Sequence, residues 1–211
     1  MKIAVINETS AADRNIDIMN ALEGRGHEII NAGMKRSGEQ PELTYIQTGL
    51  MSALLLNTGR ADYVIGGCGT GQGFMNAVMQ YPGIICGHIL TPLDAWLFMQ
   101  INGGNCVALM LNQSYGWASD ANLKFIFDAL FSVESGIGYP PHRRESQRIS
   151  RGLLKDISEL SHKSMAEIVK GLDQKILMPV LTYPGFWELL GVDGLADKSL
   201  EVSLKDRFSL I

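Results

Sequence analysis

The sequence predicts an α/β protein: a Rossmann-like three-layer sandwich around a five-stranded parallel sheet, with a C-terminal helical extension. Short apolar runs alternate with stretches of helical spacing over residues 1–135, which is the pattern of βαβ units. The runs are almost continuously apolar, as expected for strands covered by helices on both faces. Beyond residue 135 the alternation stops and helical spacing dominates.

Each expected element follows from its pattern and its end signals. The strands are expected at 2–6, 27–31, 62–66, 83–86 and 106–111. The intervening helices are expected at 15–24, 44–57, 74–80, 91–100 and 118–132. Gly24 and Gly26 end the first helix, and Thr91 followed by Pro92 opens the fourth, because threonine caps a helix start and proline fits its first turn.

The chain divides into a core and an extension. Residues 1–135 form the expected α/β core. Residues 136–211 form a helical arm, with apolar positions such as Ile149, Leu153 and Ile157 at helical spacing to about residue 175, and then an aromatic tail. We expect this extension to pack on a partner subunit. The alternative for the tail aromatics is that they cover the chain's own core.

Composition excludes several classes of protein. The 211 residues are 46% apolar, enough for a full core, and the net charge of −4 excludes a strongly basic nucleic-acid binder. No apolar run is long enough to suggest a membrane span, and the first 20 residues are typical of a strand and helix rather than a secretory leader. Cys68, Cys86 and Cys106 are odd in number without CxxC spacing, which favours a reducing cytoplasm. Cys86 and Cys106 are expected in the core.

The strongest functional signal is the glycine-rich segment that follows the third strand, Gly67-Cys68-Gly69-Thr70-Gly71-Gln72-Gly73. It lies at the carboxyl edge of the expected sheet, where open α/β sheets bind ligands. Closely spaced glycines allow backbone N–H groups to point at a ligand, and a helix N-terminus favours anions. We expect a lowered pKa for the Cys68 thiol, which suits a base beside an oxyanion pocket. The alternative is a tight turn with a buried cysteine.

A nucleotide site fits this segment poorly. The dinucleotide fingerprint is G-x-G-x-x-G after the first strand, whereas these glycines alternate and follow the third strand. No Gly-Lys-Ser/Thr triplet of a P-loop occurs.

A second candidate site lies in the extension. Arg144 and Arg148 are four residues apart, so they share one face of a helix and can grip a phosphate together. Two prolines place His142 near the start of that helix. The alternative is a solvated basic helix start.

Together these segments resemble the family of ribose-5-phosphate isomerase B and the galactose-6-phosphate isomerase subunits, over about residues 1–150. Cys68-Gly69-Thr70-Gly71 matches the family's Cys-Gly-Thr-Gly loop. Arg144 and Arg148 match its Arg-x-x-x-Arg phosphate clamp, and Asn102-Gly103-Gly104-Asn105 is similar to a segment with two asparagines before the fifth strand.

The resemblance implies an aldose–ketose isomerase that acts on a phosphorylated sugar through a cis-enediolate. Cys68 would move the proton, and Thr70 would bind near the carbonyl. The amides of Gly69, Gly71, Gln72 and Gly73 would stabilise the enediolate. Asn102 would contact sugar hydroxyls.

The resemblance also implies that Arg144 and Arg148 bind the phosphate, with His142 as a further candidate. It implies no metal and no cofactor, and from the composition we expect no nucleic-acid or membrane partner. Members of the family are dimers or larger, so we expect a homodimer or homotetramer with a shared pocket, in which the clamp can come from the neighbouring chain.

Two departures from the family bear on the substrate. Glu8-Thr9 stands where the family has Asp-His, and Ile101 stands where it has the histidine associated with opening the furanose ring. Glu8 can still bind hydroxyls. We therefore hypothesise a substrate that needs no ring opening, such as a short phosphorylated ketose. The alternative is that His88, near the end of the fourth strand, fills the same space.

Two other functions stay open. The chain could be a non-catalytic or half-active subunit of a hetero-oligomeric isomerase, since the family's histidines are missing. It could also be a thiol-dependent enzyme of another kind, although no histidine partner lies near Cys68 in the sequence.

Overall fold

A parallel five-stranded sheet forms the centre of the protein, as the sequence predicts. The computed structural model describes residues 1–209. The strands are β1 (Lys2–Asn7), β2 (Glu28–Asn31), β3 (Tyr63–Cys68), β4 (Cys86–Ile89) and β5 (Cys106–Met110). Their order across the sheet is β2-β1-β3-β5-β4, and all neighbours are parallel. All five carboxyl ends therefore lie at one edge, which we call the carboxyl edge.

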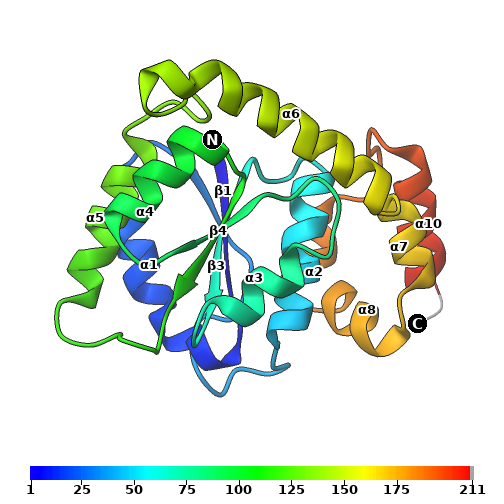
Figure 1. The fold of residues 1–211 in the computed structure, drawn as a ribbon. Coiled ribbons are helices and arrows are strands. Elements are labelled where there is room, and N and C mark those ends of the chain that lie inside the picture. Colours follow the sequence, from blue (N-terminus) through cyan, green and yellow to red (C-terminus); the bar gives the residue numbers. More distant parts are fainter. Residues whose placement is uncertain (210–211) are drawn as a thin grey trace.

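Helices cover both faces of the sheet (Figure 1). One face carries α1 (Asn15–Leu22), α4 (Pro92–Leu97) and α5 (Ser119–Phe131), and the other carries α2 (Tyr45–Asn57) and α3 (Gln72–Val78). Alternate β1 side chains point to opposite faces of the sheet and pack in two hydrophobic cores. Ile3 and Val5 pack on the α1/α5 side, and Ala4 and Ile6 on the α2/α3 side. This is the three-layer sandwich that the sequence predicts.

Two element boundaries differ from the prediction. The fourth strand begins at Cys86 rather than covering 83–86. The side chain of Asn105 explains the shift, because its Oδ1 accepts the Ile85 N–H at 3.0 Å and its Nδ2 donates to the Gly83 carbonyl at 2.9 Å. These bonds satisfy the backbone where a strand was expected. The third strand continues beyond 66, so Cys68 is its last residue rather than part of the following loop.

The extension is a series of separate helices rather than one helix to about residue 175. They are α6 (Arg144–Ser161), α7 (Met165–Gly171), α8 (Gln174–Leu181), α9 (Phe186–Leu190) and α10 (Lys198–Phe208). The chain also contains short 3₁₀ or π segments at Thr9–Arg14, Phe98–Asn102 and Pro141–Arg143. Ser164 begins α7 with a capping box that includes Glu167, and the Asp173 side chain caps α8. These capping residues break the apolar spacing into shorter helices.

The helices α7 to α10 pack on the core of their own chain. Val169, Leu181 and Phe186 are buried in the same cluster as the α2/α3 side of the sheet. The Arg60 guanidinium, just after α2, donates to the carbonyls of Leu190 at 2.7 Å and Gly191 at 2.6 Å. The large exposed apolar side chains of the extension lie mainly on α6.

Helix α6 crosses the end of the sheet opposite the carboxyl edge (Figure 1). None of its residues is buried. Arg151 attaches it to the core, donating to the carbonyls of Ile101 at 2.9 Å and Gly136 at 2.6 Å. Ile149, Leu153, Leu154, Ile157 and Leu160 are all at least half exposed, and we call these five residues the α6 stripe. Within residues 1–209, no helix is both long and apolar enough to cross a membrane.

Candidate active site

The site is built around Cys68 at the carboxyl edge. Cys68 ends β3, between β1 and β5, and its side chain belongs to the α2/α3 side of the sheet. Cys68 as a whole residue is 6% exposed, and the side chain of the exposed Thr70 lies beside it, with Sγ and Oγ1 3.9 Å apart. The cysteine is therefore a buried thiol of the α2/α3 core with an exposed threonine side chain beside it.

The segment after Cys68 is fixed by its carbonyl groups. The Cys68 carbonyl accepts the N–H groups of Leu111 at 3.1 Å and Gly71 at 3.2 Å. The Gly69 carbonyl accepts the N–H groups of Asn112 at 3.0 Å and Gln113 at 2.9 Å. Because Leu111 to Gln113 directly follow β5, the neighbouring strand end holds the loop in place.

The N–H groups of the loop divide into engaged and available donors. The Gly69 N–H donates to Ser10 Oγ at 3.0 Å, and the Gln72 N–H donates to Thr70 Oγ1 at 3.3 Å. The Gly71 N–H is bound to the Cys68 carbonyl. Thr70 and Gly73 have N–H groups without an acceptor among residues 1–209. An oxyanion hole formed by this loop would therefore use the N–H groups of Thr70 and Gly73 rather than every amide from 69 to 73.

His88 lies near the carboxyl end of the fourth strand, where the sequence predicted it, and it contacts the loop. It is the third residue of β4, and its Nε2 lies 2.9 Å from the Thr70 carbonyl. Gly71 adopts a φ of +75° directly against this ring, and a Cβ there would lie 2.7 Å from His88 Nε2. The glycine is thus required by both backbone conformation and space. In this structure His88 supports the segment that follows Cys68.

Glu8 lies at the carboxyl end of β1 but faces the protein. It is 4% exposed, and its Oε1 accepts the hydroxyl hydrogen of Ser10. Asn112 Nδ2 in turn donates to the Ser10 carbonyl. Glu8 is therefore engaged in linking β1 to the loops after β3 and β5, rather than open to sugar hydroxyls.

Three residues at this edge were not predicted from the sequence: Ser10, Asn112 and Tyr45. Ser10 and Asn112 each follow a strand that ends at the carboxyl edge. That position alone could have marked them as candidates for the site. Tyr45, at the start of α2, lies over Gly73, where an added Cβ would be 3.1 Å from its ring. The half-exposed tyrosine ring forms a wall beside one of the two available N–H donors. No local pattern marked it.

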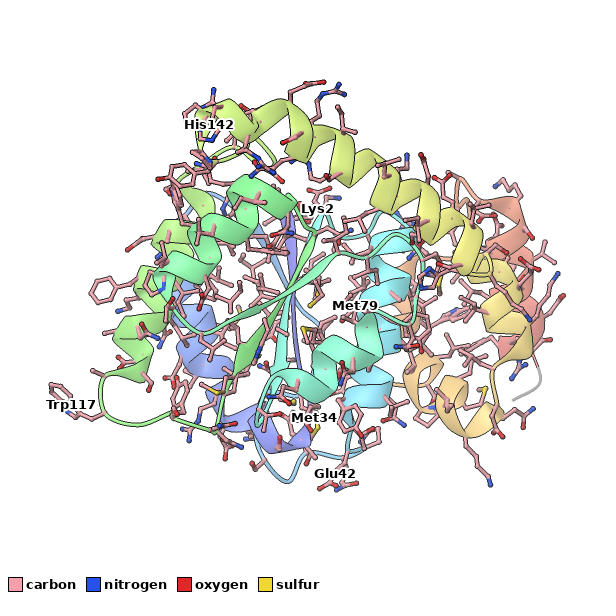
Figure 2. All side chains as sticks on the ribbon, viewed as in Figure 1. Lys2, Met34, Glu42, Met79, Trp117 and His142 are labelled. Atoms are coloured by element: carbon pink, nitrogen blue, oxygen red, sulfur yellow. The ribbon has the colours of Figure 1, made fainter. Side chains whose placement is uncertain are left out.

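The other expected site residues lie at the opposite end of the sheet. Asn102 precedes β5 and thus belongs to the amino edge, and Arg144 and Arg148 lie on α6, which crosses that edge. Figure 2 shows His142 near the same end as Lys2, which begins β1, and far from Met34 at the carboxyl edge. One chain therefore does not bring these residues to Cys68.

The two arginines also differ in how free their guanidinium groups are to bind an anion. Arg148 binds Glu145 with two hydrogen bonds, of 2.7 Å from Nη2 and 3.0 Å from Nε. This contact lowers the pKa of the Glu145 carboxyl and raises the pKa of Arg148. Arg144 donates from Nε to the Gly138 carbonyl at 3.4 Å, a long contact that leaves most of its guanidinium available.

A cavity and an open groove lie away from Cys68 in the described part of the chain. One, of about 110 Å³, lies on the other face of the sheet between β5 and α5 and includes Tyr115 and Ile126 in its wall. The other is an open groove of about 630 Å³ beside Trp187, which stacks on Phe208 at 3.8 Å. Cys68 lines neither cavity. Within residues 1–209, no three histidine, cysteine or acidic side chains gather as a metal site.

Comparisons with known proteins identify the family. The model of the Ribose/Galactose Isomerase family matches residues 3–126. No curated protein sequence matches the chain.

Among solved structures, a 4-deoxy-L-threo-5-hexosulose-uronate ketol-isomerase, complexed with a tartrate, is 35% identical, with a TM-score of 0.91. The match covers 99% of this chain and 100% of that one. A ribose-5-phosphate isomerase from Vibrio parahaemolyticus is 33% identical, with a TM-score of 0.90 over 100% of this chain and 99% of that one. The C-terminal extension is thus shared with both proteins.

A shorter relative marks the extent of the common core. The ribose 5-phosphate isomerase of Thermotoga maritima is 25% identical, with a TM-score of 0.57. The match covers 96% of that chain but 69% of this one. With Cys68-Gly69-Thr70-Gly71 at the carboxyl edge and a family match over most of the α/β core, this chain is an aldose–ketose isomerase that belongs to the ribose/galactose isomerase family.

Proposed function

We propose that the protein interconverts a phosphorylated aldose and ketose through a cis-enediolate, with Cys68 as the base. The observation that carries this proposal is the position of Cys68, at the end of a central strand, beside a loop whose carbonyls are all bound and whose Thr70 and Gly73 N–H groups are available. A thiol at the rim of such a loop can contact a substrate carbon while N–H donors meet the adjacent oxygen.

The reaction requires only a proton shuttle. The Cys68 thiolate takes the proton from the carbon beside the carbonyl, and the electron pair of that C–H bond forms the enediolate. The thiol then returns the proton to the neighbouring carbon, and a hydroxyl proton moves between the two oxygens. The Thr70 and Gly73 N–H groups bind the negative oxygen, and the Thr70 hydroxyl binds near the carbonyl.

We propose that two chains share each site. Arg144, Arg148 and Asn102 lie at the amino edge of their own sheet, so they reach a Cys68 only in another copy. The α6 stripe supports such a contact, because five large apolar side chains on one helix are left uncovered beside the arginines. His142, exposed near the start of the same helix, would join the clamp.

A carboxylate-bearing substrate is the second candidate. The relative of 35% identity is named for a hexosulose-uronate, whose anionic group is a carboxylate rather than a phosphate. The ion pair between Glu145 and Arg148 supports this alternative, because it leaves Arg144 as the freer arginine, and one guanidinium suits a singly charged carboxylate. Ile101 supports a substrate that needs no ring opening in either case.

A substrate panel tests both candidates. Four-, five- and six-carbon sugar phosphates and a deoxyhexosulose uronate are incubated in heavy water, and deuterium incorporation beside the carbonyl is measured. Cys68→Ala is expected to lose on the order of 10²-fold or more of the activity toward the substrate that is turned over. Cys86→Ala is the matched control, because Cys86 is a buried thiol on the same face of the sheet away from the loop.

The outcomes are distinct. Faster turnover of ribose 5-phosphate than of a tetrulose phosphate would contradict the hypothesis of a substrate without ring opening. A purified chain that gains activity only with a second, different subunit would favour the half-active subunit. Full exchange by Cys68→Ala would overturn the proposed mechanism.

A further inference from the structure

We propose that Ser10 is a positioning residue for the base: its hydroxyl, oriented by the buried Glu8, fixes the peptide group between Cys68 and Gly69. The inference rests on the proposed role of Cys68. Ser10 lies in the short 3₁₀ segment after β1, and neither its residue type nor its spacing marks it as part of the catalytic loop.

The contact is directional because a serine hydroxyl has one proton. Glu8 is a buried carboxylate and must accept hydrogen bonds to offset its lost hydration. The Ser10 hydroxyl donates its proton to Glu8 Oε1, which leaves only the lone pairs of Oγ for the Gly69 N–H at 3.0 Å. The acid therefore determines which way the hydroxyl points, and the hydroxyl determines which way the Gly69 N–H points.

The other side of the same peptide is held from β5. The Cys68 carbonyl, which belongs to this peptide, accepts the Leu111 N–H. The Gly69 carbonyl, in the next peptide along, accepts the N–H groups of Asn112 and Gln113. Asn112 also binds the Ser10 carbonyl through its side chain. The peptide plane after Cys68 is thus fixed on both edges, and Ser10 supplies the contact on the N–H edge.

Removing the hydroxyl would free one edge of this plane. In Ser10→Ala, the Gly69 N–H loses its acceptor and the Glu8 carboxylate loses its donor. The peptide can then rotate, which moves the Cys68 thiol and the adjacent Thr70 N–H relative to the substrate carbon. Because Ser10 does not bind the anionic end of the substrate, the loss falls on the chemical step rather than on binding.

The test compares Ser10→Ala with Ser10→Thr, which keeps the hydroxyl, and with Ser132→Ala, an exposed serine at the end of α5. The full chain is assayed on its best substrate for kcat and KM, and urea unfolding checks that each variant folds. Ser10→Ala is expected to lower kcat on the order of 10-fold to 10²-fold, with KM little changed. Ser10→Thr is expected to recover most of the loss, and Ser132→Ala to behave as the unchanged protein.

The controls separate this inference from the proposed function. If Cys68→Ala is inactive and Ser10→Ala keeps its kcat, the role of Ser10 is wrong and the base assignment stands. If Cys68→Ala stays active, the base assignment itself fails. A rise in KM alone, or a loss that Ser10→Thr does not restore, also overturns the proposal. If Ser10→Ala does not fold, Ser10→Cys is used in its place. A thiol has a similar shape but forms only weak hydrogen bonds with Glu8 and the Gly69 N–H, so Ser10→Cys must show the fall in kcat.

Discussion

Replacing Gly71 with alanine tests the most confined glycine of the segment that follows Cys68. Gly71 has a φ of +75°, a conformation that L-residues with a side chain rarely adopt. An added Cβ would lie 2.7 Å from His88 Nε2 and 3.0 Å from the Leu109 carbonyl oxygen. The substitution therefore combines backbone strain with a steric clash.

The magnitude follows from these two effects. A left-handed conformation costs an ordinary residue ~1–2 kcal/mol. Forcing an extra carbon into a filled space costs a further ~1–3 kcal/mol. The His88 ring can move away, but the Leu109 carbonyl belongs to β5 and cannot. When the ring moves, its hydrogen bond with the Thr70 carbonyl is lost, so activity should fall together with stability.

Gly59→Ala is the matched control. Gly59 also has a positive φ, of +68°, but an added Cβ there would meet no atom within 4 Å. It should therefore show the strain alone, and the difference between the two variants measures the clash. Urea unfolding followed by circular dichroism gives both free energies of unfolding.

Equal destabilisation of the two variants would refute the reasoning, because it would mean that the space beside His88 does not confine Gly71. A double variant, Gly71→Ala with His88→Ala, sharpens the test. It removes the contact with the ring and leaves the contact with Leu109. The double variant should therefore be less destabilised than the two single changes predict together.

Three further predictions concern the extension. Ile157→Asp places a charge in the α6 stripe and should shift the protein to monomers in analytical ultracentrifugation; an unchanged mass would contradict the proposed contact. Arg60→Met leaves two carbonyls at the end of α9 without donors and should lower the free energy of unfolding in urea by ~1–3 kcal/mol. An unchanged urea midpoint would show that the contact does not stabilise the fold. Hydrogen bonds from Lys205 and Lys198 lower the pKa of Glu201 from 4.5 to about 2, so its contribution to stability is present above pH 4.5 and lost as the pH falls toward 2. Glu201→Gln should lower the melting temperature at pH 7 and lose less stability than the unchanged protein between pH 4.5 and pH 2. If both proteins lose stability in parallel over that range, Glu201 is not the group responsible.

Apolar runs sufficed to locate the central strands because β1, β3 and β5 are buried on both faces. The runs at 2–6, 62–66 and 106–111 are apolar for that reason, and each lies within or beside the strand found. The fourth strand was misplaced because residues 83–86 are equally apolar. The side chain of Asn105, about 20 residues away, binds the backbone before Cys86 and moves the start of the strand.

The glycine spacing around Cys68 located the candidate site but not its supports. Local sequence can indicate that Gly71 needs a left-handed conformation, since that is a property of one residue. It cannot indicate that His88, Ser10 and Asn112 bind the loop, because these residues come from the ends of three other strands. The number of available N–H donors was also overestimated for this reason.

The sequence alone determined the layered α/β architecture, the cysteine loop and the arginine pair on one helix, because each depends on spacing within a short stretch of chain. The tertiary structure decided which amides are available, that Glu8 faces inward, and that the arginines lie at the opposite edge from Cys68. Those outcomes depend on strand order and on contacts between residues up to about a hundred positions apart, as from Ser10 to Asn112, which no local pattern encodes.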